Sequence, residues 1–311
     1  MDLTSRILIV GSTGLIGSAC LRYFQAYHYT NLLTPSRQEV DLLDKEIVDH
    51  YFKKHKPEVV ILAAGVVGGI HYNKTYPADF INRNLTIQLN VFQAAQQVGV
   101  DKLVFLGSSC MYPRECTQPM HEEMLLTGIP EPTSMSYALS KLAGVQMCRA
   151  YNQQYNQGRY IALIPNSTYG PHDDFDPKTG HVISSLIAKM HHAKISHSAS
   201  LTLWGTGNPR REFVYSADVA SAIMHILTNN NSEESVLNVG VGCDWSIKEI
   251  AEIVAKIVGY QGEIKWDTSK PDGAPRKLLN SRKMNELGWK PTVDIHQGIQ
   301  HTYEWYCETL A

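Results

Sequence analysis

The sequence predicts an α/β fold: a Rossmann-type doubly wound parallel sheet followed by a smaller C-terminal α/β lobe. Short apolar runs alternate with helical patterns through the first half of the chain, which is typical of a parallel sheet with helices on both faces. Val, Ile and Leu run continuously in these segments, as strands covered on both sides require. A glycine-rich turn follows the first of them directly. At 311 residues the chain is long enough for a large and a smaller lobe.

The elements of the first half follow one another in a regular order. Strands are expected at 6–10 (RILIV), 31–34 (NLLT), 58–64 (EVVILAA), 102–109 (KLVFLGSS) and 160–167 (YIALIPNS). Helices are expected between them at 14–28, 45–55, 82–99 and 136–155. This order predicts a nucleotide-binding domain over residues 1–170.

The pattern loosens after about Tyr169, where loops rich in Gly, Pro, Asp and Asn appear. Helical patterns continue at 181–194, 216–229, 246–259 and 295–310. We therefore expect residues 171–311 to form mostly a substrate-binding lobe that closes a cleft. Segments at about 210–245 are expected to return to the first domain, with 235–240 (SVLNVG) joining its sheet.

Composition excludes several classes of protein. The 28 Lys+Arg nearly balance the 30 Asp+Glu without a long basic run, which argues against nucleic-acid binding. The N-terminal apolar run is too short for a signal peptide, and no stretch approaches the roughly 20 apolar residues of a membrane helix. The six cysteines form no CxxC pair, so we expect no metal site, no disulfide framework and a cytoplasmic location.

The segment from Gly11 to Gly17 reads GSTGLIG and lies between the first strand and the first helix. Glycines at this spacing allow a tight turn and a close approach of the backbone to a pyrophosphate, while the helix N-terminus offers free N–H groups. A strand–helix turn without a ligand is the plainer interpretation. The placement directly after the first strand of a βαβ unit favours a dinucleotide site.

The end of the second strand bears on which dinucleotide binds. NAD-specific sites usually carry an acidic residue here to hold the ribose 2′-hydroxyl. This sequence has Ser36 and Arg37 instead, with no carboxylate until Glu39. A hydroxyl and a guanidinium suit a 2′-phosphate, so the sequence predicts NADP. Asp41 and Leu42 are expected close to the adenine.

Ser108, Tyr137 and Lys141 form the candidate catalytic trio. Tyr137 and Lys141 are spaced i, i+4, so they share one face of a helix. An ammonium beside the phenol is expected to lower the tyrosine pKa, preparing it to exchange a proton with a carbonyl or alcohol oxygen. Ser108, after the fourth strand, is placed to hold the same oxygen. A YxxxK pair alone is common by chance, and its order after the glycine loop and the serine gives it weight.

These motifs resemble the extended short-chain dehydrogenase/reductase superfamily and, within it, the GDP-L-fucose synthase family. The resemblance runs from about residue 6 to 290. It is carried by GSTGLIG, LAAGVVGG, VVGGIHYNKTYPADFI, FLGSSCMYP, YALSK, YGPHDDFD, GHVI, LTLWGTGNPRREFVYSADVA and SKPDGAPRKLLN.

The resemblance implies NADPH-dependent 3,5-epimerisation and 4-reduction of GDP-4-keto-6-deoxy-D-mannose to GDP-L-fucose. Ser108, Tyr137 and Lys141 then carry the reduction. Cys110 and His181 then exchange protons with C3 and C5. Read alone, Cys110 is more often a packing residue and His181 a loop or helix-start histidine.

The same resemblance extends to the binding residues. The cofactor contacts are Gly11, Ser12, Thr13, Gly14, Leu15, Ile16, Gly17, Ser36, Arg37, Asp41, Leu42, Ala63, Ala64, Lys141, Pro165 and His181. The substrate contacts are Ser109, Lys189, Trp204, Arg211 and Lys277, with Arg276 as an alternative to Lys277. The cations suit a nucleotide diphosphate. Trp204 suits a base or sugar, although a tryptophan in a short strand is more often a core residue.

Two positions depart from the pattern, and three other functions stay open. Ser167 stands where such proteins often carry an asparagine, with Asn166 one residue earlier, and Thr13 stands where some relatives carry an arginine. A 4-reductase for a related GDP-4-keto-deoxy sugar or heptose would not need both Cys110 and His181. An NAD-dependent nucleotide-sugar 4-epimerase would need neither of these two residues. A non-enzymatic NADP-binding sensor would not need the catalytic trio. The family also implies a homodimer through the helices at 82–98 and 137–154.

Overall fold

The computed structural model describes residues 1–155, 158–177, 179–229, 234–270 and 272–310. Lys178 and Pro271, which belong to loops of the second half, lie outside the described residues. Among the described helices, none has the length and apolar character needed to cross a bilayer.

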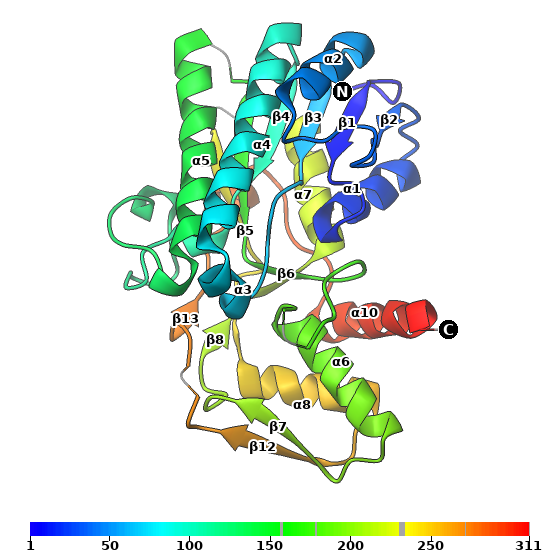
Figure 1. Cartoon of the computed structure of the whole chain (residues 1–311), viewed down its shortest axis with the longest axis vertical. Helices are drawn as coiled ribbons and strands as arrows, with labels where there is room; N and C mark the ends of the chain where they lie inside the picture. The colour runs from blue at the N-terminus through cyan, green and yellow to red at the C-terminus, as the bar shows by residue number, and fades with distance from the viewer. Residues whose placement is uncertain (156–157, 178, 230–233, 271, 311) are drawn as a thin grey trace.

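A six-stranded sheet, parallel throughout, forms the centre of the larger lobe and confirms the Rossmann-type fold (Figure 1). Its strand order is β10-β5-β4-β3-β1-β2. The strands are β1 (Ile7–Val10), β2 (Leu32–Leu33), β3 (Val59–Leu62), β4 (Lys102–Leu106), β5 (Tyr160–Pro165) and β10 (Val236–Val239). The expected return of the segment at 235–240 is confirmed, because β10 pairs with β5.

Helices cover both faces of this sheet, as its continuous apolar strands require. On one face α1 (Leu15–Ala26) packs against α7 (Ser216–Thr228). On the other face α4 (Pro77–Val98) packs against both α2 (Lys45–His55) and α5 (Met135–Tyr155). A separate hydrophobic core lies under each face. The short helices α3 (Ile70–Thr75) and α9 (Arg282–Glu286) complete this part.

The smaller lobe has a third core of its own, formed largely by α6 (Val182–Ile195), α8 (Ile247–Val258) and α10 (Ile295–Leu310). Strand β7 (Ser200–Trp204) pairs with β12 (Glu263–Asp267). Strand β8 (Arg210–Arg211) lies between β11 (Trp245–Ser246) and β13 (Arg276–Lys277). Strand β6 (Ser167–Tyr169) pairs with β9 (Phe213–Tyr215) at the junction of the lobes.

All five strands expected in the first half are shorter than predicted, and two of these differences bear on the candidate site. Strand β4 ends at Leu106, and residues Ser109–Met111 form a 3₁₀ turn in which the Ser108 hydroxyl accepts the Cys110 N–H. Strand β5 ends at Pro165, and Ser167 belongs to β6. Both ends fall where polar and small residues replace the apolar run, so the candidate site residues lie in turns beyond the sheet.

Candidate active site

The glycine loop between β1 and α1 packs too tightly to carry side chains at its first and last glycines. Gly11 has φ +86°, and a Cβ there would lie 2.7 Å from the Ala64 nitrogen. A Cβ at Gly17 would overlap the carbonyl oxygen of Gly11. The loop therefore brings bare backbone and the free N–H groups of the start of α1 to the carboxyl edge of the sheet. This arrangement fits a dinucleotide pyrophosphate.

The other expected cofactor residues lie along the same edge. Ala63 and Ala64 directly follow β3, and the Ala63 N–H donates to the Val10 carbonyl (3.0 Å). Pro165 ends β5, opposite Val239 of β10. Since the carboxyl ends of parallel strands meet at one edge of a sheet, these residues are brought together with the glycine loop.

Ser36 and Arg37 follow β2 in an exposed turn. The Ser36 N–H donates to Glu39 Oε2 (2.7 Å), and the Glu39 N–H donates to Ser36 Oγ (3.3 Å). The Glu39 carboxylate thus caps its own turn, and its pKa is lowered by the backbone N–H and the side chain of Ser36. The Arg37 side chain is exposed. Nearby, Asp41 accepts the Leu43 N–H within its own turn.

Ser108, Tyr137 and Lys141 come together at the end of β4. The Ser108 hydroxyl lies close enough to the Tyr137 phenol to lower the pKa of the phenol, against the larger effect of burial. The buried Lys141 ammonium donates to the Leu106 carbonyl (2.9 Å) and lies 5.8 Å from the centre of the Tyr137 ring. The i, i+4 spacing on α5 thus places both side chains beside the serine.

The expected lowering of the Tyr137 pKa is wrong for the protein as described. Burial raises the pKa of the phenol, the Cys110 charge raises it further, and only the Ser108 hydroxyl opposes them. Burial also lowers the pKa of Lys141 to about 8. The prediction assumed that the Lys141 ammonium interacts with the phenol, but the ammonium is bonded to the Leu106 carbonyl instead. Both groups are also buried, and the loss of solvent disfavours the charged form of each.

Cys110 is partly exposed and has a cationic partner 167 positions away in the sequence. Lys277 Nζ lies 3.6 Å from Cys110 Sγ. Burial alone would raise the pKa of the thiol, but the charge of Lys277, hydrogen bonds from Ser108 and Lys277, and the charge of His181 together lower it. A thiol with a lowered pKa is present as the thiolate more often at neutral pH than an ordinary cysteine, so it is more often available to accept a proton.

His181 lies just before α6 and is held by an acidic partner. Its Nδ1 is 3.0 Å from Asp173 Oδ1, and the other oxygen of Asp173 accepts the Ser184 hydroxyl. Burial alone would lower the pKa of His181, but the hydrogen bond and charge of Asp173 and the charge of Cys110 raise it. Asp173 was not singled out in the sequence, where it was one of several acidic residues in a loop.

The expected substrate residues divide by their surroundings. Ser109 is buried and lines a small cavity together with Glu131, Arg276 and Lys277. The Arg276 guanidinium forms an ion pair with Asp244, which leaves Lys277 as the cation beside the thiol.

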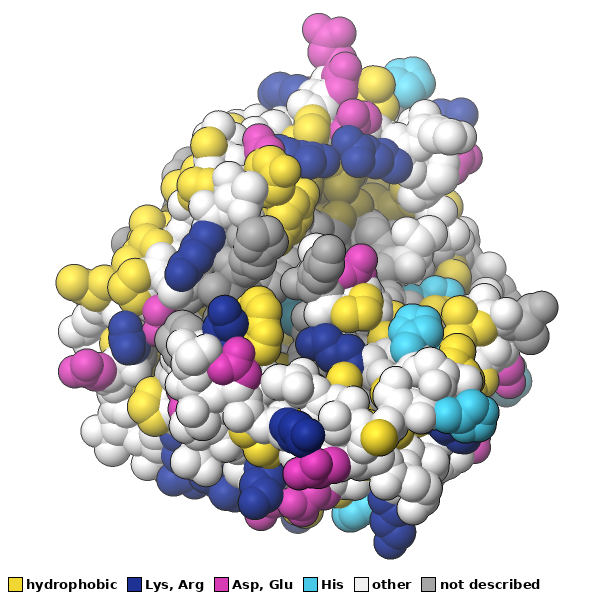
Figure 2. Space-filling view, turned by 60° about the horizontal axis from the view of Figure 1, so that its bottom comes forward, with side chains coloured by type: hydrophobic (Ala, Val, Ile, Leu, Met, Phe, Trp, Pro, Cys, Tyr) yellow, Lys and Arg dark blue, Asp and Glu magenta, His cyan; other side chains and the backbone are white. Residues whose placement is uncertain are grey.

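Three further candidates lie in the smaller lobe. Burial lowers the pKa of Arg211 and of Lys189, and the described residues provide no ion pair to either. Trp204 is 75% exposed, so it is not a core residue. Seen from the smaller lobe, Lys and Arg side chains lie around a hollow in the surface, with acidic side chains among them (Figure 2). An exposed aromatic ring suits a base, and cations without an ion-pair partner suit a diphosphate.

Asn166 and Ser167 are bonded within the protein: the Ser167 N–H donates to Asn166 Oδ1 (3.0 Å), and Asn166 in turn contacts Glu212. Asn166 is buried, and its Nδ2 donates to Glu212 Oε2 (2.6 Å). Glu212 is fully buried, although it stands beside two arginines in the sequence, and no sequence motif marks it. Its structural role is recognised from its burial, and burial cannot be read from the sequence without the fold.

The chain matches one family model, described as the NAD dependent epimerase/dehydratase family, over residues 7–240. It is 46% identical over 310 residues to a probable GDP-L-fucose synthase 1 of Oryza sativa subsp. japonica, covering 99% of this chain and 94% of the relative.

Two solved structures are also close. A GDP-L-fucose synthetase of Naegleria fowleri bound to NADP superimposes with a TM-score of 0.92 at 28% identity, covering 100% of this chain and 95% of the other. A GDP-mannoheptose C4 reductase of Campylobacter jejuni with NADP bound superimposes with a TM-score of 0.89 at 37% identity, covering 99% of both chains. The fold and the length of the whole chain therefore match proteins that act on GDP-sugars.

Proposed function

This chain belongs to the NAD dependent epimerase/dehydratase family, in its GDP-L-fucose synthase branch, and on that premise we propose its reaction. It inverts C3 and C5 of GDP-4-keto-6-deoxy-D-mannose and then reduces C4, giving GDP-L-fucose. The observation that carries the proposal is a pair of groups in one site whose pKa values are shifted in opposite directions, Cys110 downward and His181 upward. Lys277 supports a thiolate at Cys110, and Asp173 supports an imidazolium at His181.

The first role belongs to Ser108 and Tyr137. The two hydroxyl groups lie close together at the end of β4 and are placed to hold the C4 oxygen of the sugar. C3 and C5 each lie next to the C4 ketone, so a proton lost from either carbon leaves an enolate with its charge on that oxygen. Two hydroxyl donors at the oxygen stabilise the enolate and, later, the developing alkoxide, so one oxyanion site serves both reactions.

Epimerisation requires one group that removes a proton from one face of the carbon and another that delivers its own proton to the opposite face. The lowered pKa of Cys110 suits the base, and the raised pKa of His181 suits the acid. Each group keeps its useful protonation state because of a fixed neighbour, Lys277 or Asp173. A plain reductase needs neither pair.

The reduction uses the same oxygen. NADPH, when bound at the carboxyl edge of the sheet, would supply the hydride that reduces C4. Tyr137 donates its proton to the C4 oxygen, and its raised pKa means that the phenol still carries that proton at neutral pH. Lys141, held at the Leu106 carbonyl, supports the charge that develops at the phenol.

We infer NADP as the cofactor on the basis of the turn after β2. The exposed Arg37 guanidinium and the Ser36 hydroxyl suit a 2′-phosphate, and Glu39 is turned back onto the Ser36 backbone. The NADP bound by the two solved neighbours supports the same choice. In the smaller lobe Arg211 and Lys189 are proposed for the diphosphate and Trp204 for the base or sugar.

A second candidate is 4-reduction of a related GDP-4-keto sugar or heptose. It is favoured by the 37% identity to the GDP-mannoheptose C4 reductase. The assay that separates the two offers the protein NADPH with GDP-4-keto-6-deoxy-D-mannose and, separately, with a GDP-4-keto-heptose. A product that co-elutes with GDP-L-fucose supports the first candidate. NADPH oxidation on the heptose alone would overturn it.

We propose the following organisation for the whole protein. Residues 1–170 hold the cofactor and residues 171–311 mostly hold the GDP-sugar, with 210–245 returning to the first domain. The side-by-side helices α4 and α5 form a four-helix homodimer interface, supported by the exposed Leu89 and Leu139. Six unpaired cysteines support a reducing compartment such as the cytoplasm.

A further inference from the structure

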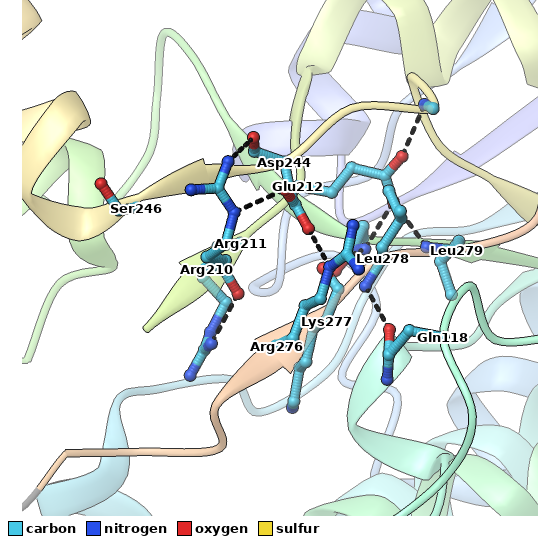
Figure 3. A network of polar contacts seen from close by, with 12 residues as sticks. Gln118, Arg210, Arg211, Glu212, Asp244, Ser246, Arg276, Lys277, Leu278 and Leu279 are labelled. Atoms are coloured by element: carbon cyan, nitrogen blue, oxygen red, sulfur yellow. Dashed lines mark hydrogen bonds and ion pairs between the residues drawn. The ribbon is translucent and has the colours of Figure 1, made fainter. Parts of the chain in front are cut away.

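Glu212 joins four segments of the chain through one buried carboxylate. It lies between β8 and β9 and is 0% exposed. Its Oε1 accepts the N–H groups of Val241 (2.7 Å) and Gly242 (2.8 Å). Its Oε2 accepts Asn166 Nδ2 (2.6 Å) and the Leu279 N–H (2.9 Å). Figure 3 shows Glu212 and Leu279 within the network of polar contacts around β8 and β13. A buried charge with two donors on each oxygen is satisfied, and removing one side of the network is costly.

The space around the carboxylate is built for it. A Cβ at Gly240 would lie 2.5 Å from Glu212 Oε1. Even an alanine there would displace the carboxylate, so a glycine at the end of β10 leaves room for it. The buried Glu212 carboxylate, the groups that donate to it and the glycine that leaves space for it therefore come from segments that are far apart along the chain.

The network holds the backbone on both sides of Lys277. The Glu212 N–H donates to the Lys277 carbonyl (3.1 Å), while Leu279, two residues later, donates to the Glu212 carboxylate. Asn166 Nδ2 also approaches the Lys277 carbonyl (3.4 Å). The Lys277 ammonium then reaches Cys110 Sγ at 3.6 Å. These bonds fix the backbone of β13, and that backbone sets the starting point from which the Lys277 side chain extends to the thiol.

We propose that Glu212 is a positioning residue: its carboxylate fixes β13 so that the Lys277 ammonium stays beside the Cys110 thiol and keeps it reactive. This rests on the proposed function, in which Cys110 is the base. The carboxylate touches neither Cys110 nor the sugar, so its effect passes through Lys277. A purely structural role predicts that removing Glu212 affects stability without a specific effect on the thiol.

The test measures alkylation of Cys110 by iodoacetamide at pH 7, read on the Cys110 peptide by mass spectrometry, without cofactor or sugar. Below the pKa, one unit of rise in thiol pKa lowers the thiolate fraction, and hence the rate, about tenfold. Glu212→Gln is expected to slow alkylation about tenfold, because its amide nitrogen cannot accept one pair of donors. Lys277→Met is expected to slow it by a similar factor.

The double variant distinguishes positioning from general loosening. Glu212→Gln combined with Lys277→Met should react no more slowly than Lys277→Met alone, because the carboxylate acts through the lysine. Additive losses, or a Glu212→Gln rate within twofold of the unchanged protein, would overturn the proposal. Asp244→Asn is the matched control: Asp244 holds Arg210 and Arg276 on the same two strands, and its removal should leave the rate unchanged.

Gly240→Ala provides a second route if Glu212→Gln does not fold. It displaces the carboxylate without removing it, and the same slowing is expected; a rate equal to that of the unchanged protein would count against the proposal. Turnover of the GDP-sugar is assayed separately. If the unchanged protein does not turn over the GDP-sugar but the alkylation rates follow the expected pattern, the proposed function is contradicted. The coupling between Glu212 and Lys277 would still stand.

Discussion

Single residues in this site take their chemistry from neighbours that are distant in the sequence. Cys110 and Lys277 are 167 positions apart, yet the ammonium lies 3.6 Å from the thiol sulfur. The motif around Cys110 marks the thiol as a candidate, but it cannot reveal the partner. Motifs predict which groups are present, and the tertiary packing decides their pKa values.

The first prediction concerns Arg37. Replacing Arg37 with Ala removes the guanidinium proposed for the 2′-phosphate, and we expect the KM for NADPH to rise about tenfold or more, equivalent to about 1.4 kcal/mol. The KM for NADH should change by less than twofold. Steady-state kinetics with both cofactors measures the effect. An equal rise for both would show that Arg37 does not read the 2′-phosphate.

The second prediction concerns the buried Lys141. Its pKa is lowered from 10.5 to about 8, so the folded state binds fewer protons than the unfolded state between these values. Folding stability therefore rises with pH through that window, and the cost of burying the charge is fully present below pH 8. Lys141→Met should abolish reduction and raise the free energy of unfolding at pH 7 by about 2 kcal/mol.

Urea unfolding at pH 7 and pH 10.5 measures this effect, and the gain from Lys141→Met should shrink at the higher pH. Lys53→Met, at an exposed lysine of α2, is the control and should show little change at either pH. A gain that is the same at both pH values would mean that burial of the ammonium is not its cause.

At the scale of elements, the sequence predicts the larger lobe well and the smaller lobe less well. Apart from the two-residue β2, the strands of the βαβ units have four to six residues and follow or precede long helices, so their apolar periods identify them. Strands β8, β11 and β13 have two residues each and are formed by pairing with one another, so no local pattern predicts them. Ser109 was predicted to lie in a strand but lies in a 3₁₀ turn after β4. The apolar run before it identifies the strand but does not reveal where the strand ends.

The turn between β1 and α1 supports a third prediction. A Cβ at Gly17 would overlap the Gly11 carbonyl, whereas the nearest atom to a Cβ at Gly14 is 3.6 Å away. We expect Gly17→Ala to lower stability by about 3 kcal/mol and to weaken NADPH binding, because backbone rather than a flexible side chain must move. Gly14→Ala should cost much less stability. Thermal unfolding compares them, and equal losses would contradict the packing argument.

At the scale of the whole molecule, the site is made by both lobes. The larger lobe contributes Cys110 and the trio at the carboxyl edge of the sheet, and the smaller lobe contributes His181 and Lys277. Glu212 ties these lobes together at β13, between the ends of β5 and β10. The family resemblance allowed Cys110 and His181 to be named from sequence, whereas Asp173 and Glu212 required the fold.

The proposed dimer gives the fourth prediction. Leu89 on α4 and Leu139 on α5 are 47% and 43% exposed. A Leu89→Lys, Leu139→Lys variant should be a monomer where the unchanged protein is a dimer, because the two charges would be buried without partners. Light scattering after size exclusion measures the mass. Leu126→Lys, at another exposed leucine, should stay dimeric, and a dimeric double variant would exclude this interface.

The central claim is that one site both epimerises and reduces. Its most direct test incubates the protein with GDP-4-keto-6-deoxy-D-mannose and NADPH in deuterated water and reads the product by NMR. The account predicts GDP-L-fucose with deuterium at C3 and C5, and loss of that deuterium in Cys110→Ser, which should still bind the cofactor. NADPH oxidation that leaves C3 and C5 without deuterium, or a Cys110→Ser variant that incorporates it as before, would contradict the account.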